Sequence, residues 1–343
     1  MQDGPTLFLN HTHTYRSNDF TADIKNTEGI DHHTDYLAIT EQLPEDIDVI
    51  YNRTEHFKTG EQLYEDIRDE LDNLDEPYEQ HDTHLWFERE GTEAAIINSV
   101  EATLEQDNWH VLITGLPIQE ETYYNLSEDE LLDAAADAAW FAPAHPFINN
   151  FRIPDSRLES MFEKAQERDD TTAALCYSTG YTPQVNRLAQ GRETRLTRLL
   201  ETVSSGSTRQ EERDVFDYAE EYELDLVPEL DLHAILPEGL EGAGVIDEPV
   251  MDQLHDGELP GDAFLDTDVL SYSGPGTEGL SWRQFITTFP GTVPLNRYLE
   301  RFLPSTAEDF QAAMEQSIAE LEFDSTDIEQ HTYNPGQWHE PSS

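Results

Sequence analysis

Short apolar runs alternate with amphipathic stretches along most of this chain. Seven runs have the length and apolar content of strands, near Thr6–Leu9, Tyr36–Ile39, Ala95–Val100, His110–Thr114, Trp140–Pro143, Ala173–Tyr177 and Leu224–Leu230. Helical periodicity lies between several of them, at Glu61–Leu74, Glu128–Ala139 and Arg209–Tyr222. Each helical stretch follows a capping-box pattern, at Thr59 and Gln62, Ser127 and Glu130, and Thr208 and Glu211. This alternation predicts an α/β fold, either a parallel barrel or an open doubly wound sheet.

Polar residues with metal-binding side chains favour the barrel over the open sheet. Histidine, aspartate or glutamate stands at the ends of at least five of the predicted strands. In a closed barrel the carboxyl ends of the strands meet at one mouth, whereas in an open sheet they are spread along an edge. We therefore expect a barrel over residues 1–234.

The pattern changes after about residue 234. Residues 235–300 are rich in Gly, Pro and Asp and show little periodicity, and a capping pattern at Ser305 and Glu308 opens a helix to about Leu321. We interpret residues 235–325 as a C-terminal extension packed on the barrel, and residues 326–343 as a polar tail.

The charge balance is extreme and spread through the whole chain. The 343 residues include 73 acidic and 19 basic side chains, for a net charge of −54. Such a charge repels itself strongly in dilute salt, but not when molar salt shortens the Debye length to about 3 Å. Because 10% of the residues are aromatic, a disordered acidic chain fits poorly. We expect a folded, halophile-adapted protein of the cytoplasm.

Composition also argues against several classes of function. Stable nucleic-acid binding needs clustered Lys and Arg, which this chain lacks. No run of 18 apolar residues predicts a membrane span. Cys176 is the only cysteine, which leaves no partner for an intrachain disulfide. We expect Cys176 to be buried in a strand, and the oligomeric state stays open.

Five segments carry the candidate chemistry, and their order is informative. They are His11-Thr-His13-Thr-x-x-Ser, Asp35-x-Leu-Ala-Ile-Thr-Glu41-Gln42, Glu101 followed by His110, Ala144-His145-Pro146, and Asp231-Leu-His233. Two histidines at i and i+2 on an extended segment project to one side, so both imidazoles can bind one ion. Each motif alone also fits an ordinary polar loop or a buried histidine, but five together favour a multinuclear metal site.

These five segments resemble the motifs of the PHP (polymerase and histidinol phosphatase) superfamily, over residues 7–233. The resemblance implies a distorted (β/α)7 TIM-like barrel with two or three divalent Mn, Zn or Fe ions, and phosphoester hydrolysis. It places His11, His13, Glu101 and Asp231 on the first metal. Glu101 would bridge to the second metal, completed by His110 and His145, and His233 would serve the third.

The second motif departs from the family pattern. Glu41-Gln42 stands where the family has Asp-His, and Asp19 stands where some members have a third-site histidine. Asp19 is an adequate oxygen ligand, but Gln42 offers only a neutral amide, so the third site would be weak, empty or suited to a harder ion. His32 and His33 are nearby substitutes, although a polar loop explains them as well.

We predict a metal-dependent hydrolase, a phosphoesterase that acts on a small phosphorylated metabolite or nucleotide through a metal-bridged hydroxide. The predicted catalytic residues are Glu101, Asp231 and His233, the last two as candidates for the general acid. The candidate phosphate-binding residues are Arg16, Arg187 and Arg192, although each could instead pair with surface carboxylates. Two alternatives stay open: a nuclease or exonuclease of the same superfamily, and a non-catalytic structural or regulatory module, which the altered second motif favours.

Overall fold

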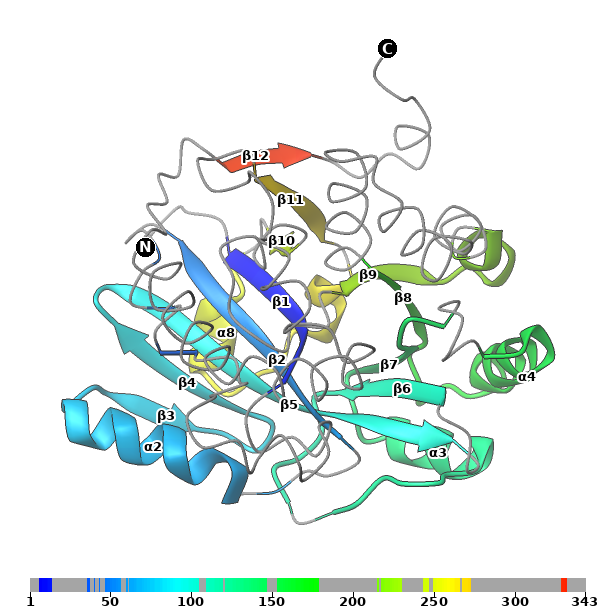
Figure 1. Ribbon diagram of the computed structural model, residues 1–343, viewed down its shortest axis with the longest axis horizontal. Helices are drawn as coiled ribbons and strands as arrows, with labels where there is room; N and C mark the ends of the chain where they lie inside the picture. Colours follow the sequence, from blue (N-terminus) through cyan, green and yellow to red (C-terminus); the bar gives the residue numbers. More distant parts are fainter. Residues whose placement is uncertain are drawn as a thin grey trace, which may run out of the picture.

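The computed structural model of the chain describes residues 6–13, 36–37, 40, 43, 47–56, 60, 62–104, 109–119, 121–146, 153–178, 215, 217–229, 243–246, 249–265, 267–272 and 328–331. These residues form a large twisted sheet, a separate pair of strands and several helices (Figure 1).

The described part of the large sheet contains ten strands of mixed direction. They are β1 (Thr6–Thr12), β2 (Asp48–His56), β3 (Tyr78–Gln80), β4 (His84–Arg89), β5 (Thr92–Leu104), β6 (Trp109–Thr114), β7 (Trp140–Pro143), β10 (Gly244–Ile246), β11 (Asp268–Tyr272) and β12 (Ile328–His331). Along the sheet the order is β12-β11-β10-β1-β2-β5-β4-β3, with β6 paired to β5 and β7 paired to β6. Strands β1, β2 and β5 are parallel, and the other pairings in this sheet are antiparallel. Strands β8 (Ala174–Ser178) and β9 (Asp225–Glu229) form the separate parallel pair.

The helices of the described residues are short. They are α2 (Gln62–Leu74), α3 (Glu128–Ala135), α4 (Asp155–Gln166), α8 (Met251–His255) and a 3₁₀ helix at Gly261–Phe264. Residues 217–222 are also helical. The predicted capping box of α3 is confirmed: the Ser127 hydroxyl accepts from the backbone N–H of Glu130, and the Glu130 carboxylate accepts from the backbone N–H of Ser127. Helix α2 buries Tyr64 and Leu71 in an apolar cluster that also contains side chains of β1 and β2.

The prediction of a parallel (β/α)7 barrel is wrong, because the fold is a mixed sheet with few short helices. The lengths of the connections explain the difference. Only residues 105–108 separate β5 from β6, and only a tight turn at Glu90 and Gly91 joins β4 to β5, with φ of 52° and 90°. A parallel crossover needs a dozen or more residues, whereas a two-residue loop with positive φ makes an antiparallel hairpin. These strands therefore cannot all run in one direction.

Most individual strand predictions are confirmed, and one is wrong. Tyr36 and Leu37 are helical, although the sequence predicted a strand at Tyr36–Ile39. The parallel neighbour of β1 is β2, which the sequence analysis did not predict. Three strands from the region after residue 234, β10, β11 and β12, extend the sheet beyond β1.

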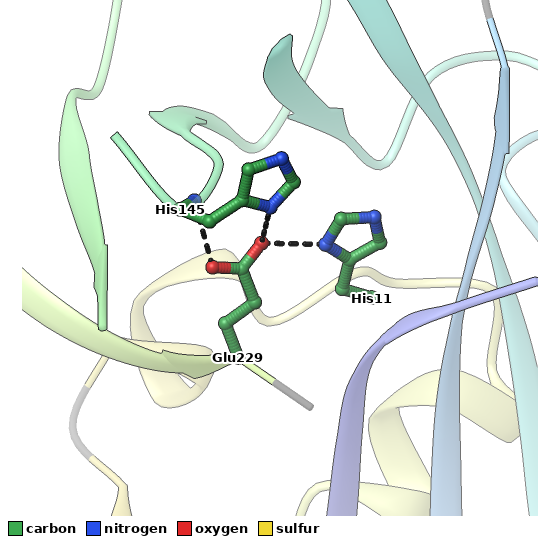
Figure 2. Close-up of side chains that lie close together, drawn as sticks. All are labelled: His11, His145 and Glu229. Atoms are coloured by element: carbon green, nitrogen blue, oxygen red, sulfur yellow. Dashed lines mark hydrogen bonds and ion pairs between the residues drawn. The ribbon is translucent and has the colours of Figure 1, made fainter. Parts of the chain in front are cut away.

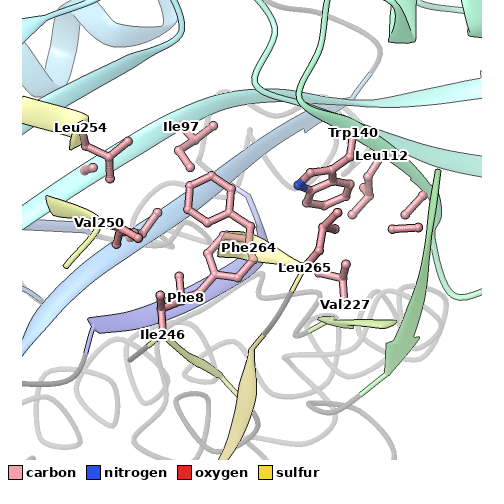
Figure 3. Packing of buried hydrophobic residues seen from close by; sticks show 14 of the residues in the cluster. Phe8, Ile97, Leu112, Trp140, Val227, Ile246, Val250, Leu254, Phe264 and Leu265 are labelled. Atoms are coloured by element: carbon pink, nitrogen blue, oxygen red, sulfur yellow. The ribbon is translucent and has the colours of Figure 1, made fainter. Parts of the chain in front are cut away.

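One apolar cluster connects the two sheets below the candidate site. Phe8 of β1 stacks on Phe264 with ring centroids 5.0 Å apart, and Trp140 of β7 and Val227 of β9 belong to the same buried cluster (Figure 3). Cys176 is buried in this cluster on β8, as predicted, and burial raises the pKa of its thiol. Because interiors pack at crystal-like density, this shared core fixes the strand ends relative to one another.

Candidate metal centre

Histidine and glutamate side chains from five strands meet at one edge of the fold. Strand β6 runs antiparallel to β5, so the start of β6 lies beside the end of β5. Strand β7 then runs back in the direction of β5, so that its carboxyl end reaches the same edge. The residues that meet there are His11 of β1, His13 just after β1, Glu101 of β5, His110 of β6, His145 just after β7, and Glu229 at the end of β9.

A bulge in β1 turns the first histidine pair toward the site. Leu9 pairs with Tyr51 and Thr12 pairs with Arg53, so β1 contains one more residue than β2 over this interval. His11 has a φ of 62°, which a non-glycine residue adopts at a cost of about 1–3 kcal/mol. His145 also has a positive φ, of 33°. Bulges and strained residues of this kind gather at functional sites.

The carboxylate of Glu101 lies among four imidazoles. Its Oε2 is 3.3 Å from Nε2 of His11 and 3.6 Å from Nε2 of His13. Its Oε1 contacts Nδ1 of His110 and is 3.9 Å from Nε2 of His145. Each oxygen therefore faces two ring nitrogens, which is the arrangement that a carboxylate bridging two metal ions requires.

A second carboxylate, Glu229, lies on the far side of two of these rings. Its Oε1 is 2.5 Å from Nδ1 of His11 and 3.2 Å from Nδ1 of His145, and its Oε2 accepts the backbone N–H of His145 at 2.8 Å (Figure 2). Burial raises the pKa of the Glu229 carboxyl. The charge of His145 and the hydrogen bonds from His11 and His145 outweigh burial and hold this pKa below its usual range.

Hydrogen bonds between buried polar side chains connect the strands that carry the histidines. The amide of Asn52 donates to Oδ1 of Asn10 at 2.6 Å and to the hydroxyl of Thr114 at 3.0 Å. The Ser99 hydroxyl donates to Oδ1 of Asn52, and the Asn10 amide donates to the Pro228 carbonyl at 2.9 Å. These hydrogen bonds link β1, β2, β5, β6 and β9, so the site is held by a connected buried network.

The donor set fits the divalent ions that the family resemblance implies. Among the described residues, three groups of side chains have ligand atoms within 4.8 Å of one another: His11, His13 and Glu101; Glu101, His110 and His145; and His11, His145 and Glu229. Imidazole nitrogens together with a carboxylate oxygen suit Zn, Mn or Fe better than Ca or Mg. Two of these groups share Glu101, which gives room for a dinuclear centre.

The structure brings together five of the predicted site residues, and the rest lie outside the described residues. The five are His11, His13, Glu101, His110 and His145. Outside the described residues are the predicted ligands Asp19, Asp231 and His233, the altered position Gln42, and the predicted phosphate-binding residues Arg16, Arg187 and Arg192.

The sequence analysis did not single out Glu229. The resemblance directed attention to Asp231 and His233, a few residues further along the chain. A signal was present all the same, because Glu229 is an acidic residue at the end of an apolar strand, and Glu101 directly follows the predicted strand Ala95–Val100.

The chain matches no protein-family model, and no curated protein matches it either. The likeness to a family therefore rests on the motif residues themselves. In the part of the chain that the structure describes, no helix has both the length and the apolar character needed to cross a membrane.

Proposed function

We propose that the protein is a metal-dependent phosphoesterase that acts on a small phosphorylated metabolite or nucleotide. The main observation behind this proposal is that each carboxylate oxygen of Glu101 lies beside ring nitrogens of two histidines. The order of the motif residues, which resembles that of the PHP superfamily, supports the same activity. The proposal concerns the chemistry of the site and does not depend on a barrel.

In this proposal the five side chains would hold two ions. His11, His13 and Glu101 would hold the first ion, and Glu101, His110 and His145 would hold the second. When bound, such a pair of ions lowers the pKa of a water molecule and neutralises charge on a phosphoryl group. The predicted general acids, Asp231 and His233, stay predictions.

The burial of the site supports a defined direction of substrate approach. The side chains of His11, His13 and Glu101 are at most 2% exposed, whereas His110 is 13% exposed. We infer that the phosphoryl group approaches on the His110 side, and that the buried residues keep bulk water away from the other side.

The charge of the chain favours a role for cations in binding the substrate. With a net charge of −54, the protein repels a phosphate at long range in dilute salt. At close range the substrate would also meet the carboxylates of Glu101 and Glu229 unless cations intervene. The same charge supports a protein adapted to a salt-rich cytoplasm, where screening is strong.

A substrate screen tests the proposal. The full chain, purified in molar KCl and loaded with Mn²⁺ or Zn²⁺, is assayed against phosphomonoesters, nucleotides and a dinucleotide diester. We expect hydrolysis of at least one phosphomonoester, a dependence on the added ion, and the loss of most of this activity in His13→Gln. His255→Gln is the matched control, because His255 is 45% exposed and lies away from the site.

Two outcomes would contradict this activity. Hydrolysis of the diester alone would favour the nuclease. A protein that binds ions but hydrolyses no ester would favour the non-catalytic module.

A further inference from the structure

Glu229 contacts the rings of two metal-binding histidines on the side that faces away from Glu101. In His11 and in His145, Nδ1 faces Glu229 and Nε2 faces Glu101. The two rings are nearly parallel, with an interplanar angle of 12° and centroids 5.8 Å apart. One carboxylate therefore contacts both rings in the same orientation (Figure 2).

The proton positions follow from hydrogen-bond chemistry. Oε2 of Glu229 accepts the backbone N–H of His145, and Oε1 lies against a ring nitrogen of each histidine, so the carboxylate acts as the acceptor for both rings. At 2.5 Å and 3.2 Å from Oε1, the Nδ1 atoms of His11 and His145 must therefore carry the protons. A neutral imidazole protonated on Nδ1 presents its lone pair on Nε2, and Nε2 is the atom that each ring directs at Glu101.

The backbone contributes to the same arrangement. Oε2 of Glu229 accepts the backbone N–H of His145, a residue whose φ is positive. This hydrogen bond stabilises a conformation that is otherwise strained. Glu229 itself is fully buried and is the last residue of β9. The residue before it, Pro228, accepts a hydrogen bond from the side chain of Asn10 of β1. The carboxylate is therefore held in place by the sheet and the core.

We propose that Glu229 is a positioning residue for the metal centre, which fixes the tautomer and the ring orientation of His11 and His145 at the same time. This inference rests on the proposed function, because it assumes that these two rings bind ions through Nε2. It differs from direct ligation by Glu229, which would need Nδ1 of both rings to turn their lone pairs toward an ion.

The experiment is a Co²⁺ titration of the metal-free full chain in molar KCl, followed by the visible absorption of the bound ion. The variants are Glu229→Gln and the matched control Glu128→Gln, in which a buried carboxylate of α3 that pairs with Arg157 and Lys164 changes instead. A hydrogen-bond partner behind a metal-binding histidine typically accounts for 10–100-fold in affinity. We expect two Co²⁺ per chain at saturation in all three proteins, with affinity lowered about 10–100-fold only in Glu229→Gln.

A second readout needs no metal. Nitrogen NMR of the metal-free protein with labelled histidine distinguishes the two tautomers of a neutral imidazole. We expect two rings protonated on Nδ1 in the wild type to become mixtures of tautomers in Glu229→Gln, and no such change in Glu128→Gln. A purely structural role for Glu229 would lower stability without changing these signals.

The outcomes separate this inference from the proposed function. Equal affinities and unchanged tautomers in Glu229→Gln would overturn the positioning role and leave the metal centre intact. The loss of one ion at saturation would make Glu229 a direct ligand, which also overturns it. If the wild type binds no Co²⁺, the proposed function and the positioning role both fail.

Discussion

Replacing Glu101 by glutamine changes the one residue that both proposed ion sites share. Gln has nearly the same shape as Glu, so the packing around β5 is kept. The substitution removes one negative charge and places an amide NH₂ where one carboxylate oxygen was. Because Oε1 and Oε2 each lie within 4 Å of imidazole nitrogens, both ion sites lose part of their attraction.

The expected loss can be estimated from the charges. Each carboxylate oxygen carries about half of the negative charge and would face a doubly charged ion. The product of these two charges is the same as for one pair of unit charges, so their interaction energy at a given distance is also the same. Even at 4 Å, about twice a metal–oxygen bond length, and at an effective dielectric constant of about 20, such a pair is worth about 4 kcal/mol. Since about 1.4 kcal/mol corresponds to a factor of ten, each ion should bind at least 10³-fold more weakly, to an order of magnitude.

Calorimetric titration of the metal-free protein with Mn²⁺ or Zn²⁺ in molar KCl measures this loss. Glu128→Gln is again the matched control, and its affinity should equal that of the wild type. Wild-type affinity for both ions in Glu101→Gln would refute the bridging role. A loss confined to one ion would mean that Glu101 is a terminal ligand of that ion.

The remaining predictions concern stability, measured by denaturant unfolding. Burial lowers the pKa of His84 to about 4, against about 6.5 in an unfolded chain. As pH falls from about 6.5 toward 4, the unfolded chain takes up a proton on His84 before the folded chain does. The free energy of unfolding of the wild type should therefore fall by up to about 3 kcal/mol more than that of His84→Gln. An equal pH dependence in both proteins would contradict this. Glu55→Gln should cost about 3–5 kcal/mol, because Glu55 pairs at 2.9 Å with the fully buried Arg53; a cost below about 1 kcal/mol would contradict the pairing. The wild type should also gain stability between dilute and molar KCl, and a flat salt response would argue against charge repulsion as the main effect of the acidic composition.

Local patterns in the sequence predicted individual elements well. The strands at Thr6–Thr12, Thr92–Leu104 and Trp140–Pro143 are long or apolar enough to be recognised from their neighbours alone. The capping box at Ser127 and Glu130 was predicted because it depends only on residues close in sequence.

Strand direction and pairing could not be predicted from apolar runs, since a run carries no direction. The short connection between β5 and β6 contained the information, because four residues are too few for a parallel crossover. Strand β2 was missed because its second half is polar. Arg53 and Glu55 are buried as an ion pair, so these strand positions look like a polar loop in the sequence.

The candidate site was more predictable than the fold, because strand ends can meet in more than one topology. In a parallel barrel His110 would follow a strand, whereas here it is the second residue of β6 and reaches Glu101 because β6 is antiparallel to β5. The role of Glu229 depended on ring orientation, which only the three-dimensional structure supplies.

The most direct test of the dinuclear centre is anomalous X-ray diffraction from crystals of the full chain loaded with Mn²⁺ or Zn²⁺. We predict two anomalous peaks on opposite sides of the Glu101 carboxylate, one beside His11 and His13 and the other beside His110 and His145. A map with no peak at Glu101, from a protein shown by elemental analysis to contain the ion, would contradict the central claim.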